Sequence, residues 1–265
     1  MDQALQHHTA GRLPEAERIY HRILQADPRQ PSALHYLGVI AHQVGNNNIA
    51  VDRITKAIAI KPDYTEAYIN LGNALQELGK LDEAAASYAK ALAIEPEFAE
   101  VHTNLGNVLQ ELGKLDEAAA SYAKALAIKP DHAEAHNNLG VALKDLGKLD
   151  EAVASYHKAL AIAPDYAEAQ SNLGVALKEQ GKLDEAVARY HKALAIAPDY
   201  ADALYNLCEV FERSNDNNAL RETVNRARRE CPEDPRFALR EAQLLNRDGD
   251  FTAGGTMKYT LSAAA

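Results

Sequence analysis

The feature that most constrains this chain is a 34-residue repeat that runs through nearly all of its 265 residues. A Leu-Gly pair recurs at that step, at Leu37-Gly38, Leu71-Gly72, Leu105-Gly106, Leu139-Gly140 and Leu173-Gly174. Segments 65–98 and 99–132 share 26 of their 34 residues. Segments 133–166 and 167–200 share 29 of 34. A period of this length indicates tandem copies of one small supersecondary unit, each of which buries its apolar face against the next.

The repeat frame divides the chain into one array and a tail. We expect a single solenoid over residues 1–250, in which the first repeat lacks its opening positions. Its parts are 1–30, 31–64, 65–98, 99–132, 133–166, 167–200, 201–234 and a terminal helix at 235–249. Residues 251–265 break the pattern and contain Gly254-Gly255, which discourages a helix. We interpret this irregular tail as a truncated repeat or as residues appended to the array.

Each repeat is predicted to form two helices. In the fourth full repeat the first helix runs over residues 133–146, with Asp131 as N-cap and Glu134 completing a capping box. Gly147 is placed to end this helix in the left-handed conformation, and the second helix runs over residues 149–162. No stretch alternates apolar and polar residues at period two, so the sequence predicts an all-α fold.

Small and large residues are distributed as close helix packing requires. Gly140, Ala152 and Ala159 allow helix backbones to approach each other. The spaces between the helices are predicted to be filled by larger side chains, namely Leu139, Leu143, Tyr156, Leu160 and Ile162. Because Trp is absent and aromatic residues make up only 6%, the aliphatic residues must build most of the core.

Composition excludes several functional classes. The formal net charge of −10 argues against a general nucleic-acid binder, because phosphate contacts need clustered Lys and Arg. No apolar run is long enough to predict a membrane span. The two cysteines, Cys208 and Cys231, form no CxxC motif, so we expect neither a disulfide framework nor a zinc framework. A reducing compartment fits, and we expect a cytoplasmic protein.

One set of residues recurs within the 34-residue frame: Leu139-Gly140, Leu143, Gly147, Ala152, Tyr156, Ala159 and Pro164. This set resembles the tetratricopeptide repeat family, and the resemblance covers almost the whole chain. The resemblance implies a right-handed superhelical α-solenoid of tandem helix-turn-helix repeats. It also implies a concave groove that is lined by the first helix of each pair.

An asparagine recurs at one place in the first helix of five repeats, at Asn70, Asn104, Asn138, Asn172 and Asn206. A side-chain amide both donates and accepts, so a row of amides suits the backbone of an extended peptide. The repeat region of O-linked N-acetylglucosaminyltransferase-like proteins carries a similar ladder. The alternative is that these amides only bond neighbouring helices.

Four further residues complete the predicted peptide-binding surface: Asn73, Asn107, Lys144 and Lys178. Val141 and Val175 replace the two asparagines in later repeats, so we expect a groove that is more polar in its first half. Some family members hold acidic peptide tails in a clamp of basic residues. The corresponding positions here are Ile69, Thr103, Asn137 and Ser171, so we expect no recognition of that kind.

Motifs of catalysis and metal binding are missing from the sequence. We find no glycine-rich phosphate loop, GxSxG elbow or HExxH motif, and we expect no enzyme activity, catalytic residue or cofactor. His132 and His136 are four residues apart, as a metal-binding pair would be, but no third ligand lies nearby in sequence. We therefore expect no metal site.

Three functional hypotheses remain open. The first is a protein–protein interaction module or scaffold that binds an extended peptide or partner segment in its concave groove. The second is the non-catalytic repeat region of a larger enzyme, such as an O-linked glycosyltransferase or a sulfotransferase, that presents protein substrates. The third is a scaffold that assembles with itself as a homo-oligomer. We expect a protein or peptide partner, without nucleic-acid binding or membrane insertion.

Overall fold

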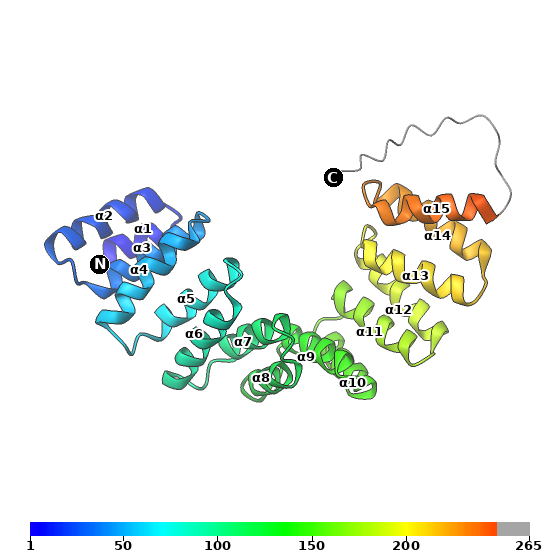
Figure 1. The fold of residues 1–265 in the computed structure, drawn as a ribbon, viewed down its shortest axis with the longest axis horizontal. Coiled ribbons are helices and arrows are strands. Elements are labelled where there is room, and N and C mark those ends of the chain that lie inside the picture. Colours follow the sequence, from blue (N-terminus) through cyan, green and yellow to red (C-terminus); the bar gives the residue numbers. More distant parts are fainter. Residues whose placement is uncertain (248–265) are drawn as a thin grey trace, which may run out of the picture. The chain divides into compact units, whose positions relative to one another are not determined.

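The structure is a computed structural model that describes residues 1–247, and within them every regular element is a helix (Figure 1). The fifteen helices of this part are α1 Asp2–Thr9, α2 Leu13–Ala26, α3 Pro31–Gln43, α4 Asn47–Ile60, α5 Thr65–Glu77, α6 Leu81–Ile94, α7 Ala99–Glu111, α8 Leu115–Ile128, α9 Ala133–Asp145, α10 Leu149–Ile162, α11 Ala167–Glu179, α12 Leu183–Ile196, α13 Ala201–Arg213, α14 Asn217–Glu230 and α15 Pro235–Arg247. The prediction of an all-α solenoid of helix-turn-helix repeats is confirmed. The irregular tail predicted at 251–265 lies outside the described residues.

The chain falls into two compact units, which we describe separately: unit 1, Met1–Pro164, and unit 2, which begins at Asp165. Unit 1 contains α1 to α10, and successive helices of this unit pack against one another. Contacts also join α3 to α5 and α7 to α9. Within this unit α3, α5, α7 and α9 lie on one side of the array and α4, α6, α8 and α10 lie on the other (Figure 1). We call the side formed by α3, α5, α7 and α9 the inner face.

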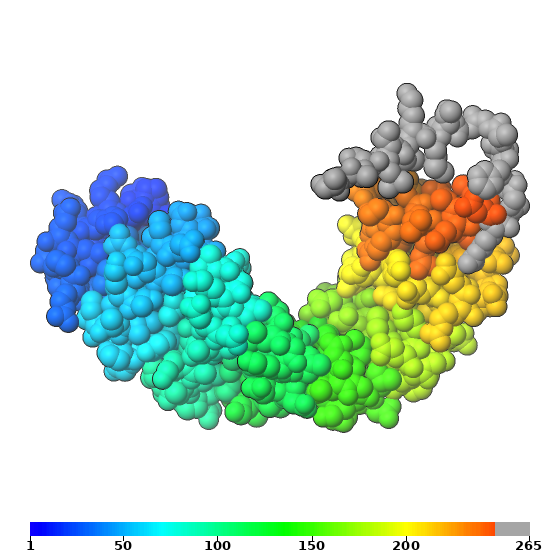
Figure 2. Space-filling view, viewed as in Figure 1, coloured from blue at the N-terminus to red at the C-terminus, as the bar shows by residue number. Residues whose placement is uncertain are grey.

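A tyrosine ring packed on a glycine forms the centre of most repeats. Tyr122 of α8 is 1% exposed, and a Cβ atom placed on Gly106 of α7 would lie 2.5 Å from its Cε1. The same pairing occurs at Gly72–Tyr88, Gly140–Tyr156 and Gly174–Tyr190. Apolar side chains from adjacent helices pack around these rings. Figure 2 shows the repeats of unit 1 in contact along the array.

The predicted space-filling residues hold with one exception. Leu143, Tyr156 and Leu160 are buried and Leu139 is half-buried, whereas Ile162 is 40% exposed. The prediction for Ile162 is wrong: this residue is the last of α10, at the end of the helix.

The turns inside the repeats depend on a left-handed residue. Gly147 has φ +75°, as predicted, and Asn215 takes the same role at φ +56° where the glycine is missing. The capping box predicted at Asp131 is wrong. The helix begins at Ala133 with His132 as its N-cap and no side-chain cap bond, so Asp131 lies one residue too early to cap it.

The last described helices of unit 2, α13, α14 and α15, enclose a small apolar cluster. Cys208 of α13 is fully buried in a cluster with Val224. Burial raises the pKa of its thiol to about 11, so the thiol stays protonated. Arg240 of α15 covers the end of this cluster. It pairs with Glu212 at 2.8 Å and lies 4.4 Å from the centre of the Tyr205 ring.

Candidate functional site

A polar pocket lies on the inner face of unit 1, where α3, α5 and α7 meet. Its volume is about 490 Å³, and its lining is His42, Asn73, Gln76, Glu77, Tyr88, Asn104 and Glu111. Asn73, Gln76 and Glu77 are three and four residues apart on α5, a spacing that brings side chains to one face of a helix. The pocket therefore follows directly from the helical period and from the stacking of neighbouring repeats.

Part of this lining is committed to bonds within the protein. Gln76 Nε2 donates to Glu111 Oε1 at 2.8 Å and thereby joins α5 to α7. The hydroxyl of Tyr88, which lies on α6, donates to Asn73 Oδ1 at 2.6 Å. Burial, with Glu111 nearby, holds the pKa of Tyr88 above its usual range, so this hydroxyl remains a donor. These bonds fix the floor and one wall of the pocket.

Two side chains of the pocket keep their hydrogen-bonding capacity. Within residues 1–247, neither the Asn104 amide nor the Glu77 carboxylate has a hydrogen-bond or ion-pair partner. Asn104 is half-buried and Glu77 is exposed. The charged residues of the lining are the two carboxylates Glu77 and Glu111, with no Lys or Arg among the lining residues described. The pocket therefore offers acceptors, one amide donor and a negative potential.

The predicted residues Asn73 and Asn107 bind tyrosine hydroxyls. Asn107 Oδ1 accepts from the Tyr122 hydroxyl at 2.8 Å, as Asn73 Oδ1 accepts from Tyr88. Asn107 Oδ1 also accepts from Asn138 Nδ2 at 3.0 Å. The structure thus brings together two predicted residues from consecutive repeats, but in a bond between helices.

The rest of the asparagine ladder is half-buried and bonded within the protein. Asn70 Nδ2 lies 2.9 Å from His35 Nε2. Burial lowers the pKa of His35 to about 4, so at neutral pH the ring is uncharged and Nε2 can accept from the amide. In unit 2, Asn206 Nδ2 donates to the backbone carbonyl of Asp202 at 2.9 Å, and Asn172 also interacts within the protein. Among the recurring asparagines in the described residues, Asn104 alone makes no side-chain hydrogen bond within the protein.

The two predicted lysines form ion pairs with neighbouring carboxylates. Lys144 pairs with the adjacent Asp145 on α9. In unit 2, the Lys178 side chain is 13% exposed, and its Nζ lies 2.6 Å from Glu209 Oε2 and 2.8 Å from Asn206 Oδ1. Lys178 therefore ties α11 to α13.

The sequence analysis missed Glu77 and Glu111 as pocket residues. A signal was present, because an acidic residue ends the first helix at the 34-residue step, at Glu77, Glu111, Asp145 and Glu179. The period alone, however, does not distinguish an acidic residue that caps a helix from one that faces the groove.

The described residues hold no group of three or more His, Cys, Asp and Glu side chains that could bind a metal ion. His136 Nε2 instead lies 3.0 Å from the Pro130 carbonyl oxygen, a backbone contact at the start of α9. Among the helices of residues 1–247, none is long and apolar enough to cross a membrane.

Two family models match the chain. The model described as the cilia and flagella-associated protein 70 C-terminal domain matches residues 2–207. The model described as tetratricopeptide repeat matches residues 177–244. No curated protein matches the chain.

Many solved structures share the fold. A structure titled "Crystal structure of MamA" is 30% identical, with a TM-score of 0.59, and the match covers 63% of this chain and 98% of that one. YrrB, titled "a TPR protein with an unusual peptide-binding site", is 27% identical at a TM-score of 0.58, with coverage of 73% and 100%. PilW, titled a "widely conserved type IV pilus biogenesis factor", is 22% identical at a TM-score of 0.70, with coverage of 79% and 97%.

Proposed function

The chain belongs to the tetratricopeptide-repeat family of the cilia and flagella-associated protein 70 C-terminal domain, and we propose that it is a protein-interaction module that binds an extended partner segment on the inner face of unit 1. One observation carries the proposal. Asn104 presents an amide without a partner in the described residues beside an unpaired carboxylate, at the edge of a pocket whose other walls are already fixed.

An extended segment has backbone groups that suit this pocket. The Asn104 amide can donate to one peptide carbonyl and accept from one peptide N–H, since a side-chain amide has both functions. Glu77 and Glu111 add a preference for a basic side chain or for further N–H donors. The solved structure of YrrB supports this proposal, because its title describes a tetratricopeptide protein with a peptide-binding site.

The proposal assigns peptide binding to fewer asparagines than the sequence predicted. Asn70, Asn138 and Asn206 bind neighbouring residues, so we assign them a structural role together with Asn73 and Asn107. The proposed module is non-catalytic and binds protein or peptide rather than nucleic acid. We propose a cytoplasmic location, because both cysteines are free and a reducing compartment keeps thiols in that state.

Selection from a display library of random 12-residue peptides tests the proposal. The full chain is the bait, and enriched peptides are synthesised with a fluorescent label and measured by anisotropy. For inner-face binders we expect Asn104→Ala to weaken affinity about tenfold, because one to two hydrogen bonds at about 1 kcal/mol each are lost. Glu77→Gln should weaken the binding of basic peptides most.

Glu117→Gln is the matched control, because Glu117 is an exposed carboxylate at the start of α8 and does not line the pocket. The Glu117→Gln variant should bind the selected peptides with the same affinity as the unaltered chain. The proposal is wrong if no selected peptide loses affinity in Asn104→Ala, provided that the variant keeps the helical content of the parent.

A further inference from the structure

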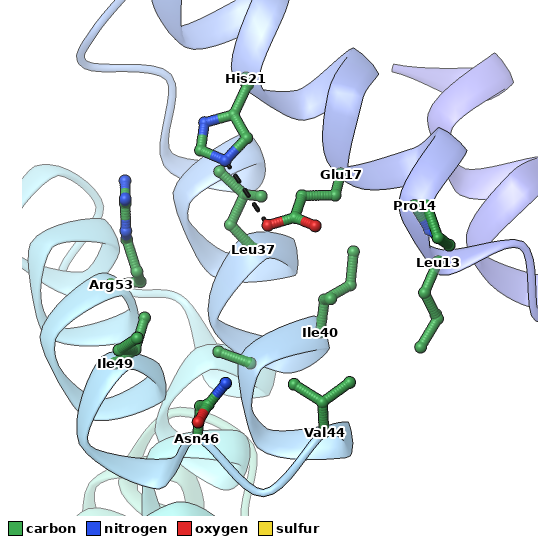
Figure 3. A pocket seen from close by; sticks show the side chains of 11 residues that line it. Leu13, Pro14, Glu17, His21, Leu37, Ile40, Val44, Asn46, Ile49 and Arg53 are labelled. Atoms are coloured by element: carbon green, nitrogen blue, oxygen red, sulfur yellow. Dashed lines mark ion pairs between the residues drawn. The ribbon is translucent and has the colours of Figure 1, made fainter.

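A second pocket lies where α2, α3 and α4 meet, and its lining is mostly apolar (Figure 3). Its volume is about 270 Å³, below the ~300 Å³ at which small-molecule sites begin. The lining is Leu13, Pro14, Glu17, His21, Leu37, Ile40, Ala41, Val44, Asn46, Ile49 and Arg53. His42, which lines the polar pocket, and Ala41 are neighbours on α3. Consecutive residues of an α-helix point in directions about 100° apart around its axis. The two pockets therefore occupy different faces of α3.

The cavity exists because repeat 31–64 departs from its neighbours at one core position. Ala41 stands where the following four repeats have a buried leucine, at Leu75, Leu109, Leu143 and Leu177. Ala41 lacks the isobutyl group of these residues, and the volume next to it remains open. A void of this kind forfeits dispersion contacts, so a side chain that fills it gains them.

A second departure makes the rim of this cavity apolar. Ile49 stands where the following four repeats carry an exposed glutamate, at Glu83, Glu117, Glu151 and Glu185. Ile49 is 52% exposed and Val44 is 56% exposed, and both border the cavity. Figure 3 shows Ile49 on one side of the pocket and Ile40 and Val44 together on the other. Large exposed aliphatic side chains at the mouth of a cavity indicate a docking surface.

The charges at the rim indicate what kind of partner fits. Glu17 already has a polar neighbour within the pocket, because its Oε1 lies 3.7 Å from His21 Nε2. Arg53 is half-buried and makes no ion pair or hydrogen bond within residues 1–247. Figure 3 shows Arg53 next to Ile49 and across the cavity from Glu17, with its guanidinium pointing away from Ile49. A half-buried guanidinium gains most from a carboxylate that it can bind through two parallel hydrogen bonds.

We propose that this pocket docks a segment of a partner protein that inserts one large aliphatic or aromatic side chain beside Ala41 and places a neighbouring carboxylate on Arg53. The apolar rim extends the contact beyond the cavity, which favours a peptide over a small apolar acid. A second copy of this chain is a poorer fit, because one side-chain-sized cavity and two rim residues fall far short of the ~800 Å² per partner that a stable dimer buries. This site is additional to the inner-face site and does not depend on it.

The test uses the same peptide library and the full chain, now with variants that restore the residues of the neighbouring repeats. Ala41→Leu fills the cavity, and Ile49→Glu restores the charged rim. Peptides specific for this site should carry a large apolar residue next to Asp or Glu. Either variant should weaken their binding at least tenfold. Arg53→Gln should remove their preference for Asp over Asn.

Two variants serve to separate a loss of peptide binding at this pocket from a loss of folding and from binding at other repeats. Ile49→Glu alters an exposed side chain, so it remains informative if Ala41→Leu disturbs the core. Glu83→Ile gives the next repeat the same apolar rim over a position already filled by Leu75, and should neither create nor change binding.

Three outcomes would overturn the proposal. The first is that every selected peptide binds the Ala41→Leu and Ile49→Glu variants with unchanged affinity. The second is binding of laurate, but of no peptide, in a manner that Ala41→Leu abolishes. The third is a dimer in sedimentation that Ala41→Leu dissociates, because the occupant would then be a second copy.

Discussion

The tyrosine-on-glycine packing predicts that Gly106→Ala destabilises the protein although alanine is the better helix former. In a free helix this change is worth about 1 kcal/mol in favour of alanine. Here the new Cβ atom would meet Tyr122 Cε1 at 2.5 Å, Cδ1 at 2.7 Å and Cζ at 2.9 Å. All three distances are well inside the ~3.5–4.0 Å of a normal carbon contact. The ring is 1% exposed, so it has no open space to move into.

The size of the effect follows from these distances. Overpacking of this kind costs about 1–3 kcal/mol. A shift of the ring by about 1 Å also breaks the bond from its hydroxyl to Asn107, which is worth about 1 kcal/mol. After the gain in helix propensity, we expect a net loss of about 1–3 kcal/mol in the free energy of unfolding.

A double-mutant cycle tests the cause, because the chain itself contains a compensated version of this pair. In repeat 201–234 the glycine is Cys208 and the tyrosine is Val224, and both are buried. Tyr122→Val removes the clash, so the Gly106→Ala/Tyr122→Val variant should lose about 1–3 kcal/mol less than the two single losses added together.

The assay is urea unfolding followed by circular dichroism, with transition midpoints and slopes compared across the four proteins, since repeat arrays need not unfold in two states. Additive losses, or a Gly106→Ala variant as stable as its parent, would refute the packing argument.

Three further predictions concern polar groups in the core. Asn107→Ala should cost about 1–3 kcal/mol, because the Asn138 amide loses its acceptor and the Tyr122 hydroxyl keeps only the longer contact to Gln110 Oε1 at 3.2 Å. Asn104→Ala should stay within about 0.5 kcal/mol, and thermal unfolding separates the two variants. Tyr190→Phe should be neutral or slightly stabilising, because this hydroxyl is buried without a partner in the described residues, while Tyr88→Phe should cost about 1 kcal/mol; equal urea midpoints for the two variants would contradict this. His35 has a pKa lowered to about 4 by burial, so its contribution is full above pH ~6.5 and is lost as the pH falls toward 4. The free energy of unfolding should therefore drop by about 3 kcal/mol as the pH falls from about 6.5 to about 4. In the His35→Gln variant, urea unfolding at a series of pH values should show a smaller drop over the same range.

Residues of similar appearance in the sequence have different roles in the structure. Asn104 and Asn138 occupy the same place in the repeat, yet Asn138 binds Asn107 and Asn104 faces a pocket. The residue types do not distinguish the two amides, because asparagines stand 31 residues before both of them, at Asn73 and Asn107. Only the pair Asn138–Asn107 forms a hydrogen bond. The sequence period gives that pairing only after the packing of neighbouring helices is known.

The sequence by itself determined the helical array. A 34-residue period, a glycine for most left-handed turns and a proline after each helix pair leave no other regular structure for residues that recur so closely. Local rules suffice there, because each helix begins and ends through contacts within a few residues. Tertiary structure alone decided which amides are free and where cavities open. Ala41 appears in the sequence as one more small residue, and it becomes the floor of a pocket only because the helices around it keep the spacing set by the larger residues of the neighbouring repeats.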